Sequence, residues 1–113
     1  MKTSVVFILL LSSTPVAQAA TFTPQQAAAH IGENATVEGM ASVFVSKGGT
    51  TFVDLGGSGR DAPFTGVIFK EKTVKFPSIT ALSGQIVDIT GQIREYRGKP
   101  EIILNSMDQV RRK

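Results

Sequence analysis

The sequence predicts an all-β fold, a small barrel of five strands with one short helix before the first strand and another between strands three and four. Five short runs between residues 36 and 105 are rich in β-branched and apolar residues and are separated by turn residues. Gly39 and Gly91 interrupt two of these runs, which suits the bends that a small barrel needs. A length of 113 residues allows one core and excludes two domains.

The first nineteen residues have the layout of a secretory signal peptide. Lys2 supplies a positive start, and Val5–Leu11 is an apolar run too short to cross a bilayer, which takes about 20 residues. Ala17-Gln18-Ala19 then has the small-residue pattern of a cleavage site. We therefore expect cleavage after Ala19, a mature domain of residues 20–113 and a periplasmic or secreted location. The alternative, a buried N-terminal strand, leaves the small-residue segment unexplained.

The charge of the chain changes once this segment is set aside. The whole sequence has 12 basic and 9 acidic residues, a net charge of +3, and loss of Lys2 lowers it to +2. Three of the basic residues are the terminal Arg111, Arg112 and Lys113, and the body without them carries −1. The positive balance is therefore weak evidence for a nucleic-acid partner. The absence of cysteine excludes disulfides, thiolate metal sites, a cysteine nucleophile and a thioether-linked lipid.

The segment after the cleavage site carries the signals of a short helix. Thr23 is a capping residue, Pro24 suits the first helical position, and Gln26 stands three residues after the cap, as in a capping box. Phe22 and Ala27 occupy the positions of a hydrophobic staple. We expect Gly32 to end this helix.

Three strands are predicted to follow, over residues 36–46, 51–55 and 64–69. The two adjacent glycines of Lys47–Thr50 predict a hairpin turn between the first two strands. Residues 56–63 form a polar, glycine-rich loop that carries Arg60. This loop lacks the spacing of a phosphate-binding P-loop.

The second half of the chain starts with a charged segment. Lys70, Lys72 and Lys75 are expected to lie on an exposed loop, followed by a short helix from Ser78 to Gly84. Strands four and five cover residues 85–94 and 101–105, with residues 95–100 as the turn between them. Residues 107–110 are expected to add a partial strand, and residues 111–113 to fray.

The order of these elements and their motifs resemble a known family. The parts that carry the resemblance are the L-x-G-x-x-V-x-I-x-G run of Leu82–Gly91 and the hairpin of Tyr96–Leu104. They are similar to the OB-fold, a five-stranded Greek-key barrel, of the anticodon-binding and single-strand-binding type found in small exported bacterial proteins. The resemblance covers about residues 31–110. It implies a ligand site across strands two and three with the flanking loops Lys47–Thr50 and Arg94–Pro100.

The candidate binding residues are basic and aromatic. Arg94, Tyr96, Arg97 and Lys99 fall within six residues, where the cations can neutralise phosphates and Tyr96 can stack on a base. Phe44 and Phe64 are expected to face outward and stack on bases, whereas Phe52 and Phe69 are expected in the core. The full set of predicted nucleic-acid-binding residues is Phe44, Lys47, Arg60, Phe64, Arg94, Tyr96, Arg97 and Lys99.

Catalysis is not expected from this sequence. His30 is the only histidine, and Asp54, Asp61 and Asp88 are isolated, so neither a catalytic triad nor a metal cluster is indicated, and no cofactor is expected. The OB-fold nucleases have an Asp-Arg-Glu motif that this chain lacks. We expect an exported module that binds single-stranded DNA or RNA weakly. The alternative is a periplasmic module that binds a protein of the cell envelope, which the body charge of −1 favours.

Overall fold

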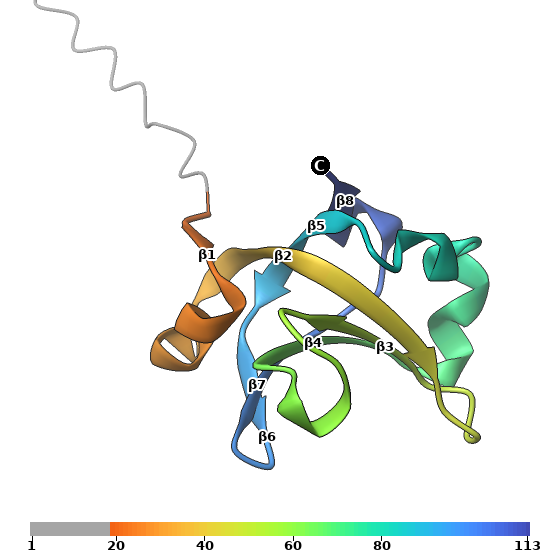
Figure 1. Cartoon of the computed structure of the whole chain (residues 1–113), viewed down its shortest axis with the longest axis horizontal. Helices are drawn as coiled ribbons and strands as arrows, with labels where there is room; N and C mark the ends of the chain where they lie inside the picture. Colours follow the sequence, from red (N-terminus) through yellow and green to blue (C-terminus); the bar gives the residue numbers. More distant parts are fainter. Residues whose placement is uncertain (1–18) are drawn as a thin grey trace, which may run out of the picture.

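The computed structural model describes residues 19–113, and the predicted signal segment up to residue 18 lies outside this range. The described part is mostly β-structure with short 3₁₀ helices, and its strands form one mixed sheet in the order β6-β7-β4-β3-β2-β5-β8, with β1 paired to β2 (Figure 1). The strands are β1 (Thr21–Phe22), β2 (Asn34–Val45), β3 (Thr51–Leu55), β4 (Phe64–Ile68), β5 (Ile86–Gln92), β6 (Arg94–Tyr96), β7 (Lys99–Ile103) and β8 (Val110–Arg112).

The long strand β2 belongs to both halves of the sheet. Its first part, up to Met40, pairs antiparallel with β5, and its second part, from Ala41, pairs antiparallel with β3. Gly39 lies next to this change of partner, where a Cβ atom would come within 2.7 Å of the Pro24 side chain. Glycine therefore allows β2 to approach the N-terminal helix as the strand curves across the molecule (Figure 1).

In residues 19–113 no backbone ladder joins β5 to β7 directly, although only Ile93 separates β5 from β6, which pairs with β7. The closed barrel that the sequence predicts is therefore not observed. The side chain of Gln109 lies in this gap instead, donating through Nε2 to the carbonyls of Thr90 and Ile103, each at 3.1 Å. Gly91 allows the two strands to approach, because a Cβ there would lie 2.7 Å from Cγ2 of Ile102. One side-chain amide thus links β5 to β7 here, next to the β6–β7 ladder.

The inner faces of these strands form a single hydrophobic core. Val37, Val53, Val87 and Ile89 are fully buried at its centre. Other large side chains that are fully buried come from the remaining strands and loops: Leu55, Phe64, Ile68, Ile93, Ile102 and Leu104. Most of these residues recur at every second position of a strand, as the alternation of strand side chains requires.

The predicted N-terminal helix is present as the 3₁₀ helix η1 (Pro24–His30). Both bonds of the capping box form: Thr23 Oγ1 accepts from the Gln26 amide at 3.3 Å, and the Thr23 amide donates to Gln26 Oε1 at 2.9 Å. The ring of Phe22 stacks on His30 with centroids 3.7 Å apart. This stack, which the sequence did not predict, joins the start of η1 to its end.

Four further 3₁₀ helices lie between strands, η2 (Gly59–Asp61), η3 (Lys70–Lys75), η4 (Ile79–Leu82) and η5 (Met107–Gln109). The predicted helix after Ser78 is confirmed by η4, with Ile79 buried. The prediction that Lys70, Lys72 and Lys75 lie on a loop is wrong, because these residues form η3. The buried Phe76 follows this helix. The turn predicted at residues 95–100 is longer than the observed turn, since only Arg97 and Gly98 separate β6 from β7.

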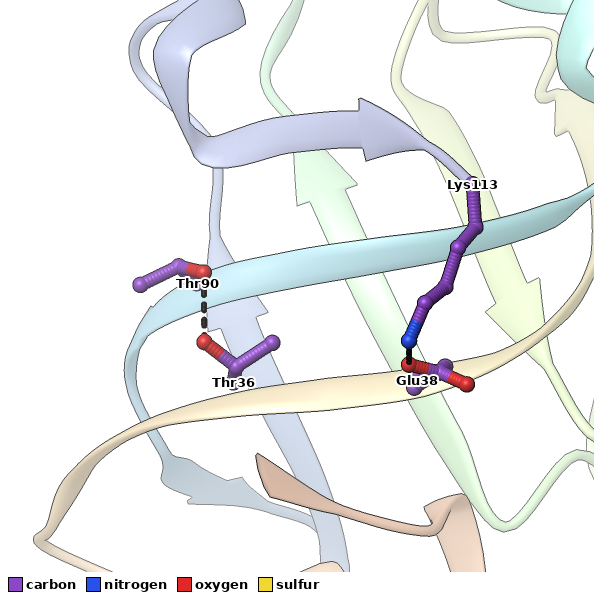
Figure 2. A network of polar contacts seen from close by, with 4 residues as sticks. All are labelled: Thr36, Glu38, Thr90 and Lys113. Atoms are coloured by element: carbon purple, nitrogen blue, oxygen red, sulfur yellow. Dashed lines mark hydrogen bonds and ion pairs between the residues drawn. The ribbon is translucent and has the colours of Figure 1, made fainter. Parts of the chain in front are cut away.

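The C-terminal residues do not fray as the sequence led us to expect. Val110, Arg111 and Arg112 pair with β5, and the Lys113 amide donates to the Ile86 carbonyl at 2.9 Å. The Lys113 ammonium donates to Glu38 Oε2 at 2.6 Å, next to the cross-strand bond of 2.7 Å between the hydroxyls of Thr36 and Thr90 (Figure 2). A polar tail is therefore held as an edge strand by partners far away in the sequence.

Asp88 lies beside this ion pair, and one of its carboxylate oxygens has no hydrogen-bond partner among the described residues. It is the cross-strand neighbour of Glu38, and its buried Oδ1 has no hydrogen-bond partner among residues 19–113. Burial and the neighbouring Glu38 carboxyl raise the pKa of Asp88, whereas the hydrogen bond from Lys113 lowers the pKa of Glu38. The charge on Asp88 is therefore unfavourable in the folded state.

Within residues 19–113, no helix has the length and apolar character needed to cross a membrane.

Replacing Gln109 tests whether its amide holds β5 and β7 together. We expect Gln109→Ala to lower the free energy of unfolding by about 1–2 kcal/mol, since it leaves part-buried backbone groups without their partner in the protein. Gln109→Glu should lose at least as much, because a carboxylate cannot donate to the two carbonyls. Urea unfolding measures both changes, with the exposed Gln85→Ala as the matched control. A midpoint for Gln109→Ala equal to that of the control would show that the bridge is dispensable.

Asp88→Asn should raise stability at neutral pH. A group whose pKa is raised on folding stabilises the fold below its unfolded pKa and loses that contribution as the pH rises through the folded pKa. The variant should therefore melt at a higher temperature than the wild type at pH 7. The two melting temperatures should converge at pH values below the ordinary aspartate pKa of 3.8. Thermal melts across this range provide the measurement, with Asp108→Asn at an exposed carboxylate as control. Equal melting temperatures of Asp88→Asn and wild type at pH 7 would contradict the assignment.

Candidate functional site

An open groove of about 1010 Å³ lies over the outer face of the sheet. Its floor comes from β3, β4 and β7, and its sides come from η1, the end of β2, the η2 loop and the turn between β6 and β7. The residues that line it are Gln25, Ala28, Phe44, Phe52, Asp54, Gly59, Arg60, Asp61, Ala62, Pro63, Thr65, Tyr96, Arg97, Gly98, Lys99, Pro100 and Glu101.

Two phenylalanines form an apolar platform at one side of the groove. Phe44 on β2 and Phe52 on β3 are direct cross-strand partners, and their ring centroids lie 6.3 Å apart at an interplanar angle of 20°. The side chain of Phe44 is 59% exposed and that of Phe52 is half-buried. An exposed aromatic pair of this kind offers a flat surface on which a planar ligand can stack.

A polar row crosses the groove floor next to this platform. Asp54 on β3 is in register with Thr65 on β4, and Thr65 is in register with Glu101 on β7. Asp54 is only 5% exposed, and both of its oxygens are used: Oδ1 accepts from the Thr65 hydroxyl and Oδ2 from the Gly59 amide, each at 2.8 Å. Asp54 therefore positions the η2 loop.

The cations of the groove come from the η2 loop and from the β6–β7 turn. Arg97 has φ of 51° and Gly98 has φ of 78°, so a two-residue turn of the kind that suits tight hairpins carries Arg97. The Arg97 guanidinium lies 5.3 Å from the centroid of the Tyr96 ring. Lys99 donates from Nζ to the Gly59 carbonyl at 3.0 Å, which joins the turn to the loop that carries Arg60.

Five of the predicted binding residues meet in this groove, namely Phe44, Arg60, Tyr96, Arg97 and Lys99. Lys47 and Arg94 are exposed but are not among the residues that line it. Phe44 is exposed as predicted, and Tyr96 is 56% exposed. The hairpin and the outer face of the sheet therefore contribute to one surface.

For three phenylalanines the predicted orientation, toward the core or toward solvent, is the reverse of the observed one. Phe64 is fully buried and cannot stack on a ligand, because it is paired with Leu55 and shares the inward face of β4 with Gly66 and Ile68. Phe52 faces the groove, since the inward positions of β3 are Val53 and Leu55. Phe69, expected in the core, follows the end of β4 and is 47% exposed.

The groove is mixed in charge. Arg60, Arg97 and Lys99 are balanced by Asp54, Asp61 and Glu101 among its lining residues. Burial raises the pKa of Glu101, and the nearby charges of Arg94 and Lys99 lower it in part. Phe52, Thr65 and Glu101 were not predicted as binding residues, because only the register of β3, β4 and β7 places them on one surface. No group of three or more metal-ligating side chains occurs in the part of the chain that the structure describes.

No protein-family model matches the chain, and no curated protein matches it. The fold is similar to part of a crystal structure of a protein assigned as an aspartyl-tRNA synthetase from Leishmania major Friedlin, with a TM-score of 0.56 and 14% identity. The match covers 90% of this chain and 22% of that one, so this chain corresponds to about a fifth of the larger protein. The likeness is in fold, and it is consistent with the OB-type arrangement that the sequence resembles.

Proposed function

We propose that this protein is an OB-fold binding module that holds single-stranded nucleic acid in the groove and has no catalytic role of its own. The observation that carries the proposal is the stacked pair of Phe44 and Phe52, with Phe44 exposed, in a groove that three cations also line. Bases stack on such aromatic platforms, each contributing about 1–3 kcal/mol, and cations along the groove contact the phosphates. The β2–β3 face is also the usual ligand face of the OB-fold.

The balance of charge in the groove makes the binding weak and only moderately sensitive to salt. Three cations neutralise at most three phosphates, and the carboxylates of Asp54, Asp61 and Glu101 oppose them. Since the slope of log affinity against log salt is about −0.7 per phosphate contact for single strands, we expect a slope no steeper than about −2. Stacking then provides the larger share of the affinity.

Removing the platform tests this function directly. Fluorescence anisotropy with a labelled single strand of about 12 nucleotides at low salt measures the affinity. Phe44→Ala combined with Phe52→Ala should weaken binding by at least about tenfold, because two stacking surfaces are lost. Phe69→Ala removes an exposed ring outside the groove and should leave the affinity unchanged. If the wild type shows no binding at low ionic strength, the proposed function is wrong.

The second candidate function is recognition of a protein of the cell envelope. The equal numbers of cations and carboxylates in the groove favour it, because an extended peptide carries both charges and a nucleic acid carries only one. This function predicts a flat oligonucleotide titration together with a specific co-purifying protein that is lost in the Phe44→Ala, Phe52→Ala double variant.

We also propose that the domain acts after export. The backbone supports this placement of the cleavage site, since the Ala20 carbonyl accepts from the Thr36 amide at 2.9 Å at the start of the β1–β2 pairing. Cleavage after Ala19 would leave the paired residues intact. Expression of the full chain in a bacterial host, followed by N-terminal sequencing of the periplasmic or secreted fraction, should give a chain that starts at Ala20. Recovery of only the full-length chain in the cytoplasm would contradict this proposal.

A further inference from the structure

Glu101 is the acidic side chain of the groove that the protein leaves without a close partner. Of the three carboxylates there, Asp54 uses both oxygens within the fold and Asp61 is exposed at the η2 loop. Glu101 is half-buried on the floor, and among residues 19–113 no cation lies within 4.0 Å of it. Among residues 19–113 no hydrogen bond to its two oxygens is formed, and only the charges of Arg94 and Lys99 act on it from nearby. A ligand that supplies donors can therefore bind this carboxylate in place of water.

The register of β6 and β7 sets what such a ligand can reach. Tyr96 pairs with Lys99, and Arg94 pairs with Glu101, so the side chains of Tyr96 and Glu101 lie on one face of the hairpin as diagonal neighbours. Diagonal neighbours on an antiparallel pair lie about 7–8 Å apart. A base stacked on Tyr96 extends its edge across that spacing toward Glu101.

Guanine has the edge that matches a carboxylate. Its N1–H and its N2 amino group are adjacent donors, and they can bind the two oxygens of one carboxylate in parallel. Adenine and cytosine offer one amino group beside a ring-nitrogen acceptor. Thymine and uracil offer one N–H between two carbonyls, which a carboxylate repels. The donor pattern therefore distinguishes guanine from the other four bases.

We propose that Glu101 makes the groove selective for guanine, with the base stacked on Tyr96 and its Watson–Crick edge bound by the Glu101 carboxylate. This inference rests on the proposed function. It assigns a specificity-determining role to a residue whose negative charge otherwise opposes a polyanion. It also explains how an acid on the groove floor is compatible with a nucleic-acid ligand.

Guanine and inosine provide the critical comparison, because inosine lacks only the N2 amino group. The probes are thymidine tracts of about 12 nucleotides with a single central guanosine, inosine, adenosine or cytidine. For the wild-type protein we expect the guanosine probe to bind about tenfold more tightly than the inosine probe, as for a bidentate contact to a base. The adenosine and cytidine probes should bind no better than the uninterrupted thymidine tract.

Two variants separate the role of Glu101 from general charge effects. Glu101→Gln keeps the shape of the side chain and should reduce the difference between guanosine and inosine to less than about twofold, because one oxygen acceptor becomes a donor. Its affinity for the plain thymidine tract should be unchanged or higher. Asp61→Asn removes another groove carboxylate and should keep the preference for guanosine. Equal melting temperatures would show that the variants are folded.

The outcomes distinguish this inference from the function on which it rests. Equal binding of the guanosine and inosine probes by the wild type, or a preference that persists in Glu101→Gln, overturns the role of Glu101 alone. Failure of every probe to bind the wild type overturns both proposals. Loss of the preference in Glu101→Gln with retained binding of the thymidine tract supports both.

Discussion

Four hydrogen bonds of the Gln109 side chain link β5 to β7 and to the loop that follows β7. Oε1 accepts from the amides of Asn105 and Ser106 at 2.7 and 3.1 Å, and Nε2 donates to the carbonyls of Thr90 and Ile103. Both polar atoms of this half-buried amide therefore have partners, as is usual for polar groups away from water. The bonds add a second link between β5 and β7, whereas β2 joins the two halves of the sheet through its ladders with β5 and β3.

The groove is formed by the outward positions of three strands of this sheet. Once β7 is fixed beside β4, the outward positions of β3, β4 and β7 fall into register as Asp54, Thr65 and Glu101. Asp54 then holds the Gly59 amide, and Lys99 holds the Gly59 carbonyl, so the η2 loop is tied to the sheet from two sides. The position of Arg60 in the η2 loop thus depends on hydrogen bonds to β3 and β7 as well as on the loop itself.

Local signals in the sequence were sufficient for most elements and insufficient for the faces of the strands. The capping box of Thr23 and Gln26 and the helix after Ser78 involve neighbours in the chain, so their patterns are readable without the fold. The orientation of Phe52 and Phe64 depends on which alternate positions face the core, and apolar residues occupy both faces of β3 and β4. Glu101 and the pairing of β8 depend on strands distant in sequence, which no local pattern specifies.

The two strands at the ends of the sheet, β6 and β8, have a consequence for self-association. Each has three residues, and the exposed side chains of Arg94 and Glu95 on one and Arg111 and Arg112 on the other carry charge. Short, charged edge strands are poor templates for the addition of a strand from another molecule. The charges of Arg111 and Arg112 therefore disfavour pairing of the β8 edge with a strand of another molecule.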